Sequence, residues 1–446
     1  MATSDPLEVH LYGRHVADVL DAGLGDTAVR YTPEAVEVGA PARLSLSMPV
    51  REEVYPAAYH GTRWARSLLP EGRALQQAIR IHQVPEHDRF ALLSALGRDV
   101  AGALVIVPRG ADLEDERAGY QPLDDAGLAD LLARAHDLAL GMDEDRMVRL
   151  SLAGMQDKVL LHRAEGSRQY ARPLYGAPST EIAKPEPPTG IGGVDLTGIA
   201  TNEALCLALA DACGFQAAQA QVRAFGDTTA LFVRRYDRAD RSDGKVERRH
   251  QEDVLSALGK DPLLKYEVGE ERRLEPVGGF ADPDPVRRDP GPGLDDVARL
   301  LERHLGRASL LTLVEIVTFN VVIGNADAHA RNLSLILEPD GSVRLAPLYD
   351  LLCTRAYPEV QRDAPQLVNG VHDLDEIRLH DIRTHAQTWD LPPAVVRRRT
   401  SRVVARVLER LDATVGRVAA AGAQAPYAEA VASVIRRRAK ALAEAD

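Results

Sequence analysis

The stretch Phe319–Asp350 constrains the fold most, because it joins the end of a buried helix to a polar loop and a hairpin. Ser309–Val322, with the sequence SLLTLVEIVTFNVV, is nearly all apolar and long enough for a buried helix. Gly324 predicts the end of that helix, since glycine takes the left-handed conformation at little cost. Two short apolar runs, Leu333–Leu337 and Val343–Leu345, enclose a Pro-Asp-Gly turn and predict an antiparallel hairpin. Such a hairpin would return the chain to the polar loop.

The polar loop and the end of the hairpin carry oxygen-bearing side chains at a spacing that suits phosphoryl transfer. Asn332 and Asp350 are candidate Mg²⁺ ligands, because this ion takes few protein oxygens and keeps water and phosphate oxygens for the rest. Asp327 lies earlier in the loop, where we expect it to accept a hydroxyl proton. Protein kinases use the same parts: an Asp base, a metal-binding Asn and a metal-binding Asp. A surface loop rich in Asp and Asn, which favour turns, is the simpler interpretation.

Length and composition limit the class of protein. The 446 residues predict two or three domains, and the apolar fraction of 45% is enough for a substantial core. The net charge of −12 argues against indiscriminate binding to nucleic acid phosphates. Cys206, Cys213 and Cys353 are too few and too scattered for a disulfide framework or a zinc site. Because we find neither a signal peptide nor the run of roughly 18 apolar residues that a membrane span needs, we expect a cytoplasmic protein without a membrane partner.

The N-terminal part has the patterns of a structural or docking domain. Leu7–Val50 alternates apolar and polar residues in short runs, which predicts a small antiparallel sheet or barrel. Trp64–Ile79 and Arg89–Leu96 are typical of helices, and Ala101–Val107 of a buried strand. An amphipathic helix is expected over Asp124–Leu140. We find no catalytic constellation in this part of the sequence.

A glycine turn between two expected strands is a candidate phosphate-binding loop. Arg149–Arg163 reads RLSLAGMQDKVLLHR, and Ala153-Gly154 would let successive backbone N–H groups approach phosphate oxygens. Lys158 adds a positive charge. A plain hairpin turn remains the alternative, because the GxxxxGK[ST] spacing is absent. Ser151 is a candidate for phosphorylation, since its hydroxyl lies beside the expected phosphate loop.

The next segments predict a lysine-bearing strand and a helix. Lys184 stands near the end of the expected strand Glu181–Pro185, one strand after the glycine turn, as the phosphate-pairing lysine does in kinases. Thr201–Cys213 predicts a helix with a Thr/Asn cap. Glu203 on its first turn is expected either to pair with Lys184 or only to complement the helix dipole.

The following hairpin is the candidate adenine site. Gln221–Arg238 turns at a Gly-Asp pair, and its second strand runs out into Arg234-Arg235-Tyr236, where an adenine would find backbone donors and acceptors. A solvated charged turn is the alternative interpretation. The rest of the chain predicts one long loop and a series of helices: the loop Val277–Gly293, and helices over His250–Leu258, Leu294–Leu305, Asp381–Leu391, Pro393–Val418 and Tyr427–Ala445.

Taken in order, these segments resemble one known family over nearly the whole chain. The matching segments are LSLSMPV, LLPEG, LSALGRDVAGAL, SLAGMQDKVLL, STEIAKP, NEALCLALA, FVRRYDR, HQEDVLSALG, KYE, NADAHARN and LAPLYDLLCT. The sequence resembles the HipA-type serine/threonine kinases, which are toxins of type II toxin–antitoxin modules. The resemblance implies an α+β, protein-kinase-like, two-lobed fold with an extra N-terminal β-rich subdomain and an α-helical C-terminal lobe.

The resemblance also assigns domains and residue roles. It implies an N-terminal HipA-type subdomain at 1–108, a connecting helical segment at 109–148, a kinase N-lobe-like part at 149–240 and a helical C-lobe at 241–446. Asp327 would be the catalytic base, and Asn332 and Asp350 would hold Mg²⁺. ATP would be bound by Ala153, Gly154, Met155, Gln156, Asp157, Lys158, Lys184, Arg234, Arg235, Tyr236, His329, Asn332 and Asp350. Ser151 resembles the serine whose autophosphorylation switches such kinases off.

The partners that the resemblance implies are a HipB-type helix-turn-helix antitoxin, with DNA bound only through it, and a protein substrate such as glutamyl-tRNA synthetase or another aminoacyl-tRNA synthetase. Two departures stand out: Arg234 replaces the usual Glu of the hinge, and Arg331 replaces a common Lys of the catalytic loop. The main hypothesis is an active Mg-ATP-dependent kinase. The alternatives are a catalytically silent co-repressor scaffold and a metal-dependent phosphohydrolase, which would need neither the glycine turn nor Lys184.

Overall fold

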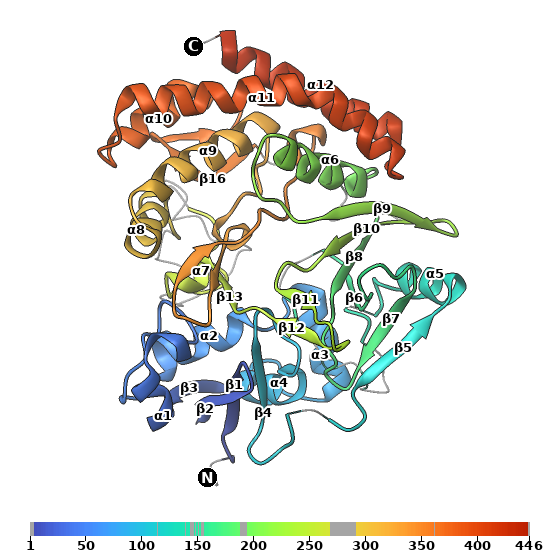
Figure 1. Cartoon of the computed structure of the whole chain (residues 1–446), viewed down its shortest axis with the longest axis vertical. Coiled ribbons are helices and arrows are strands. Elements are labelled where there is room, and N and C mark those ends of the chain that lie inside the picture. The colour runs from blue at the N-terminus through green and yellow to red at the C-terminus, as the bar shows by residue number, and fades with distance from the viewer. Residues whose placement is uncertain are drawn as a thin grey trace, which may run out of the picture. The chain divides into compact units, whose positions relative to one another are not determined.

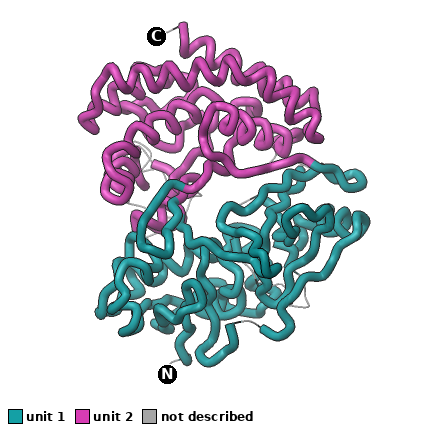
Figure 2. Tube along the Cα trace, viewed as in Figure 1, with its two compact units in different colours: residues 1–187, 223–252, 335–345 teal, residues 188–222, 253–334, 346–446 magenta. Residues whose placement is uncertain are grey.

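The chain folds into two compact units. The computed structural model describes residues 4–444 except 114, 139, 143–146, 148, 150, 153–155, 188–193, 268–290 and 361. Unit 1 comprises Met1–Pro187, Arg223–Glu252 and Leu335–Leu345, and unit 2 comprises Pro188–Val222, Asp253–Ser334 and Ala346–Asp446 (Figure 2). Both units are therefore assembled from segments that are distant in the sequence.

The N-terminal part of unit 1 is the expected antiparallel sheet, but it is open and does not close into a barrel. Its strand order is β3-β2-β1-β4. Buried Val9, Val19, Val29 and Ile106 belong to one apolar core shared with the neighbouring helices. The elements are β1 (Leu7–Leu11), β2 (Arg14–Gly23), β3 (Asp26–Tyr31), β4 (Leu104–Pro108), α1 (Pro33–Val38), α2 (Thr62–Ser67), α3 (Gly72–His82) and α4 (Arg89–Leu96).

The second half of the expected strand region, up to Val50, is different. Pro33–Val38 is helix α1, because the Thr32 hydroxyl accepts a hydrogen bond from the Ala35 backbone N–H at 3.1 Å and Pro33 suits a first helical turn. The LSLSMPV segment contains only an isolated bridge between Ser45 and Met48. Its backbone is held by a side chain instead of a strand partner, since the Leu46 N–H donates to the Glu252 carboxylate at 2.7 Å.

The rest of unit 1 is built from a four-stranded sheet and smaller sheets. The main sheet has the order β6-β8-β10-β9, and helix α5 packs against β8 and β10. Of the two strands expected around the glycine turn, the described residues contain only the second, β6. The elements are β5 (Gly119–Leu123), α5 (Asp125–Ala133), β6 (Val159–Leu161), β7 (Tyr170–Leu174), β8 (Glu181–Pro185), β9 (Ala220–Phe225), β10 (Thr228–Arg234), β11 (Arg238–Asp240), β12 (Val246–Arg248), β13 (Gln251–Asp253), β14 (Ser334–Leu337) and β15 (Val343–Leu345).

Unit 2 is mostly helical, and its long helix α11 packs against α6, α9, α10 and α12 (Figure 1). Among the described residues, no helix combines the length and apolar character needed to cross a membrane. The elements are α6 (Ile199–Ala212), α7 (Val254–Ala257), α8 (Leu294–Leu305), α9 (Ala308–Ile323), β16 (Asp363–Val368), β17 (Val371–Asp373), α10 (Leu379–Gln387), α11 (Pro393–Ala420) and α12 (Ala425–Glu444).

Two helix starts differ from the prediction. Helix α6 begins after Gly198, and the expected cap residues Thr201 and Asn202 are buried inside it. Their side chains form tertiary contacts instead: the Thr201 hydroxyl accepts from Gln424 N at 3.1 Å, and the Asn202 amide donates to Cys353 O at 3.0 Å. The helix expected from His250 starts only at Val254, after strand β13. The expected long loop Val277–Gly293 falls, up to residue 290, outside the described residues.

Candidate functional site

A rigid turn follows helix α9 and starts the candidate catalytic loop in unit 2. Helix α9 ends at Gly324 in the left-handed conformation, as expected. The Thr354 hydroxyl donates to Gly324 O and accepts from Ala326 N, both at 2.9 Å. Asn325 accepts from Asp327 N at 3.0 Å and donates to Asn320 at 2.9 Å. These side chains hold the loop from both sides, so the residues that follow have a defined position.

The loop holds the Asn332 side chain by a hydrogen bond and leaves the Asp327 carboxylate accessible. The Asn332 amide Nδ2 donates to the Asp327 backbone carbonyl at 2.8 Å, which leaves the Oδ1 of the same planar amide on the opposite side. The Asp327 side chain is 46% exposed, and its Oδ1 accepts the Tyr266 hydroxyl at 2.5 Å. A carboxylate that is this accessible and whose hydrogen-bond donor is neutral is suited to accepting a proton.

His329 lies beside the candidate base as a neutral ring. Its Nε2 is 3.8 Å from Asp327 Oδ1, and its ring meets the Tyr266 ring edge-on with the centroids 5.1 Å apart. Burial lowers the pKa of His329, against the opposing effect of Asp327 and Asp350. The buried Nδ1 has no hydrogen-bond partner among the described residues. A buried polar atom without a hydrogen-bond partner at a cavity wall is expected to contact a ligand or water.

Asp350 reaches the same place after the hairpin. It has a φ of 53°, in the left-handed region that Asn and Asp tolerate better than most residues. Asp350, Asn332 and His329 all line one cavity of about 70 Å³ within unit 2. The remaining wall of the cavity is mostly apolar and includes Leu313 and Ile316 of helix α9. The structure therefore places His329, Asn332 and Asp350 at one cavity, with Asp327 Oδ1 3.8 Å from His329 Nε2. Their roles stay predictions.

Arg331 of the same loop points elsewhere. Its side chain is buried, and its Nε is 3.3 Å from the carboxylate of Asp253, which caps helix α7. The Tyr349 hydroxyl donates to the Arg331 backbone carbonyl at 2.5 Å. The positive charge that replaces the common Lys therefore ties the loop to α7, and it does not line the cavity.

The candidate phosphate loop lies in unit 1, and Ala153, Gly154 and Met155 fall outside the described residues. Ser151, just before them, is fully buried. Its hydroxyl donates to Leu68 O at 2.5 Å and its backbone N–H donates to Asp99 O at 2.8 Å. The candidate phosphorylation site is thus packed against the N-terminal part of unit 1.

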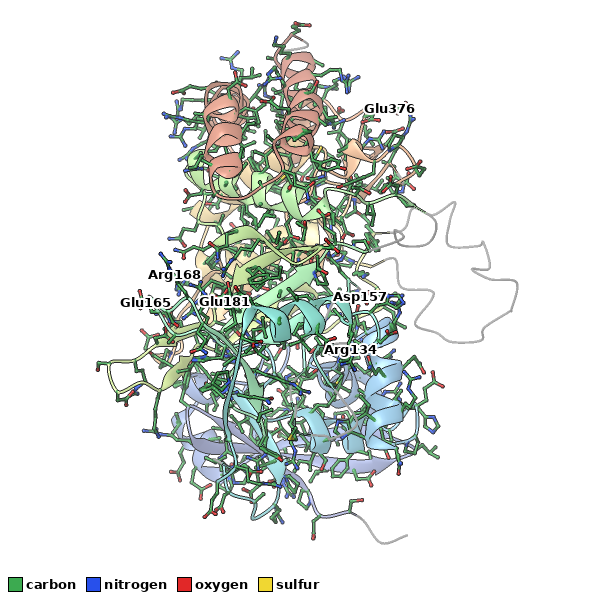
Figure 3. All side chains as sticks on the ribbon, turned by 90° about the vertical axis from the view of Figure 1, so that its right-hand side faces the viewer. Arg134, Asp157, Glu165, Arg168, Glu181 and Glu376 are labelled. Atoms are coloured by element: carbon green, nitrogen blue, oxygen red, sulfur yellow. The ribbon has the colours of Figure 1, made fainter. Side chains whose placement is uncertain are left out.

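The described part of the candidate phosphate loop, residues 156–158, is held by ion pairs and by burial. Asp157, which is labelled in Figure 3, accepts from Arg73 at 3.2 Å and lies 2.9 Å from His136. Gln156 is half-buried, and Lys158 is only 8% exposed. The Lys158 carbonyl accepts from Leu140 N at 2.8 Å, so the start of strand β6 is anchored.

Lys184 lies on strand β8 as expected, opposite Leu231 of β10, and it is 9% exposed. Glu203 belongs to unit 2, so its pairing with Lys184 stays a prediction. Glu181 at the start of the same strand is labelled in Figure 3 and is paired with Arg163 at 2.7 Å. Burial raises the pKa of Glu181, while Arg163 and Arg234 oppose this rise.

The candidate hinge follows strand β10, and its side chains are engaged within unit 1. Arg234 contacts Asp240 at 2.9 Å, and Arg235 contacts Asp237 at 2.8 Å. The Tyr236 hydroxyl donates to the Gln251 side chain at 2.9 Å. An adenine at this position would therefore meet the backbone of the segment and not its arginine side chains.

A buried ion network behind the hinge was missed by the sequence analysis. Asp99 accepts from Arg238 at 2.9 Å and from Ser179, and it lies 3.4 Å from Arg248. The polar residues that form it are scattered along the chain, so no local pattern marks them. Tyr266 was also missed as a site residue, although its KYE segment was among the matching motifs.

The donor set fits a small, hard cation. Asp350 brings a carboxylate to the cavity wall and Asn332 an amide, beside the further amides of Asn320, Asn325 and Gln366. No group of three or more His, Cys, Asp or Glu that could hold a metal exists among the described residues. Such a set of oxygen donors suits Mg²⁺, which completes its octahedron with water and phosphate oxygens. The Nδ1 of His329, which lacks a hydrogen-bond partner within the described part of the chain, fits a further polar ligand.

Comparison with known proteins decides the family. The model of the HipA-like C-terminal domain matches residues 150–415, and that of the HipA N-terminal domain matches residues 7–107. The chain belongs to the HipA family. A relative named "Putative kinase Y4mE" from Sinorhizobium fredii is 33% identical over 90% of this chain and 92% of its own length. The "Serine/threonine-protein kinase toxin HipA" of Shewanella oneidensis is 27% identical over 90% of this chain and 87% of its own.

The fold is confirmed by a solved structure of a HipA protein. The Shewanella oneidensis HipA, in a complex with HipB and operator DNA, superposes with a TM-score of 0.78 at 23% identity, over 98% of this chain and 97% of that one. The α+β, protein-kinase-like class predicted from the sequence is therefore correct.

Proposed function

We propose that this HipA-family chain is a Mg-ATP-dependent serine/threonine protein kinase and the toxin of a toxin–antitoxin pair. The observation that carries the proposal is the convergence of Asn332, Asp350 and His329 on one cavity, with the accessible Asp327 carboxylate 3.8 Å from His329. A family relationship to proteins named kinases supports it.

Each residue has a role in this proposal. Bound ATP supplies the phosphoryl group, and Mg²⁺ neutralises the charge of its phosphates. Asp327 accepts the proton of the substrate hydroxyl, while Asn332 and Asp350 hold the metal. The N–H groups of residues 153–158 and the ammonium groups of Lys158 and Lys184 bind phosphate oxygens, and the backbone of Arg234–Tyr236 holds the adenine.

Ser151 is the proposed site of autophosphorylation. Its hydroxyl is fully buried against the Leu68 carbonyl, where a dianionic phosphate would meet a carbonyl oxygen. Because burying such a charge without a cation is costly, phosphorylation must displace the segment that starts the phosphate loop. The modified chain is then expected to bind nucleotide less well.

A protein substrate and an antitoxin complete the proposal. The resemblance implies an aminoacyl-tRNA synthetase such as glutamyl-tRNA synthetase as substrate, and the relative in the solved complex assembles with HipB and operator DNA. We propose a HipB-type helix-turn-helix partner through which this chain reaches DNA. In a band-shift assay, the chain alone is expected to leave operator DNA unshifted. Added to the complex of antitoxin and DNA, it is expected to shift the band further.

The test of the proposed function is phosphate transfer in purified protein. Wild type incubated with Mg-ATP is expected to gain one phosphate, and Ser151→Ala is expected to gain none. No gain by initially unphosphorylated wild type, together with intact antitoxin binding, would instead favour the co-repressor scaffold. Release of free phosphate from a phosphoprotein without ATP would favour the phosphohydrolase.

A further inference from the structure

The short segment Lys265–Glu267 places one tyrosine directly on the candidate base. The Tyr266 hydroxyl lies 2.5 Å from Asp327 Oδ1, and the Tyr266 ring packs edge-on against His329. A carboxylate can only accept hydrogen bonds, so the phenol is the donor. Burial raises the pKa of Tyr266, and the charges of Asp327 and Asp350 raise it further, which keeps the hydroxyl protonated.

The backbone on both sides of Tyr266 is fixed. The Lys265 carbonyl accepts from Ala330 N of the catalytic loop at 3.4 Å, while Glu267 N donates to Pro365 O at 2.9 Å. The Glu267 carboxylate accepts from Leu367 N at 2.8 Å. Tyr266 is therefore held between the catalytic loop and strand β16.

A glycine allows this packing. Gly291 has a φ of +75°, and a Cβ at this position would lie 2.1 Å from the Tyr266 carbonyl oxygen. Only glycine fits so close to the backbone of Tyr266. The backbone that carries Tyr266 is thus held by hydrogen bonds to the catalytic loop and to strand β16, with Gly291 packed closely against it.

We propose that Tyr266 is a positioning residue for the base: its hydroxyl holds Oδ1 of Asp327 so that Oδ2 faces the substrate hydroxyl. The inference rests on the proposed function, because it assigns Asp327 the role of base. A carboxylate fixed before the substrate binds does not have to be ordered during the reaction, and misplacement of a catalytic group by about 1 Å can cost about 100-fold in rate.

Other groups around the base do not replace this donor. His329 is 3.8 Å away, beyond hydrogen-bond distance, and is neutral. Asn325 and Asn332 contact only the backbone of Asp327. Among the described residues, Tyr266 is therefore the hydrogen-bond donor to the Asp327 carboxylate itself.

The kinetic test is Tyr266→Phe, which removes the hydroxyl and keeps the ring against His329. A hydrogen bond to a charged group predicts a fall in kcat of about 10- to 100-fold, with KM for ATP and for the protein substrate within about twofold of wild type. The matched control is Tyr59→Phe, because Tyr59 is 64% exposed. Its kcat and melting temperature are expected to equal those of wild type.

Three results would overturn the inference. An unchanged kcat would mean that the hydroxyl does not position the base. A higher kcat would mean that it competes with the substrate for the carboxylate. A change confined to KM, or a melting temperature lowered in step with kcat, would mean that Tyr266 only supports the fold.

A second measurement separates this inference from the proposed function. 3-Fluorotyrosine at position 266 should give a ¹⁹F signal that shifts when Asp327→Asn is introduced, without any nucleotide present, while fluorotyrosine at position 59 should not shift. An absent shift would overturn the inference alone. Absence of phosphate transfer by wild type would overturn the proposed function, and the positioning role with it.

Discussion

The two aspartate clusters of the molecule are held in opposite ways. In unit 1, Asp99 and Asp237 are buried and contact arginines, with Asp99 2.9 Å from Arg238 and Asp237 2.8 Å from the same residue. In unit 2, Asp327 is 46% exposed and accepts from the neutral Tyr266 hydroxyl. Both clusters are rich in Asp, but only the second leaves a carboxylate accessible.

The difference shows how burial and charge neutralisation separate structural from functional carboxylates. Burial by itself would raise the pKa of Asp99, but Arg238, Arg235 and Arg248 lower it. A carboxylate so surrounded is not available to a proton or a metal ion. Breaking a buried pair is also strongly destabilising, because the remaining charge stays buried without compensation. We therefore expect substitutions in the Asp99 network to change stability and those at the cavity of unit 2 to change activity.

The largest effect is expected for Asp350→Asn. In the proposed mechanism Asp350 holds Mg²⁺, and loss of its charge would remove several kcal/mol of transition-state stabilisation. This corresponds to a loss of about 10²- to 10⁴-fold in the rate of phosphate transfer. Asn tolerates the left-handed φ of 53°, so the free energy of unfolding should change by less than about 1 kcal/mol. Radioactive phosphate transfer and urea unfolding measure the two quantities.

The control for this variant is Asp130→Asn, at an exposed position of helix α5. It is expected to leave both the rate and the free energy of unfolding unchanged. A loss of stability in Asp350→Asn that matches its loss of activity would mean that Asp350 is a structural carboxylate, as Asp99 is.

Asp99→Asn should have the opposite effect: a large loss in the free energy of unfolding. It removes the negative charge that faces the buried guanidinium groups of Arg238 and Arg248, which predicts a loss of about 3–5 kcal/mol in the free energy of unfolding. Urea unfolding with and without the substitution measures it. A change below about 1 kcal/mol would mean that the network contributes as little as a surface ion pair.

The lowered pKa of His250 in unit 1 predicts how stability depends on pH. Burial lowers the pKa of His250 to about 4, and the neutral ring donates through Nε2 to Leu44 O at 2.9 Å. Between pH 6.5 and 4 the unfolded chain therefore binds a proton that the folded chain does not. Stability should fall by up to about 3 kcal/mol as the pH is lowered through this window.

His250→Gln, which keeps a donor for Leu44 O, is the comparison variant. Its free energy of unfolding, measured at pH 7 and at pH 4.5, should fall less than that of wild type. An equal fall in both proteins would mean that His250 does not cause the pH dependence.

The smallest effect is expected for Arg331→Lys, which keeps the positive charge. Because Arg331 pairs with Asp253 and does not line the cavity, the rate should change less than about threefold. The free energy of unfolding should drop by about 1 kcal/mol, since Lys cannot reproduce the guanidinium geometry. A loss of rate comparable with that of Asp350→Asn would place Arg331 in the active site.

Local signals explain which elements could be predicted from the sequence. Helices α4 and α8 and strand β8 have the predicted bounds, since Asp88 caps α4 and Gly306 follows the end of α8. The errors lie where tertiary contacts override such signals. Thr201 looks like a cap residue, yet it lies inside α6 because its hydroxyl is used by Gln424 N.

The same distinction between local signals and tertiary contacts applies to the candidate site. Asp327, Asn332 and Asp350 could be predicted, because a loop and a hairpin bring them together over a short stretch of chain. Tyr266 could not, since it is 61 residues from Asp327 and reaches it only through the packing of the folded unit. The buried partners of Asp99 are likewise distant in sequence; Arg238, for example, is 139 residues away.

The most direct test of the central claim is the intact mass of the purified protein after incubation with Mg-ATP, for wild type and Asp327→Asn. Asn has nearly the same shape as Asp and cannot act as a base, so the fold should survive the substitution. We expect one added phosphate on wild type and none on Asp327→Asn at equal melting temperatures. Equal phosphorylation of both proteins would contradict it.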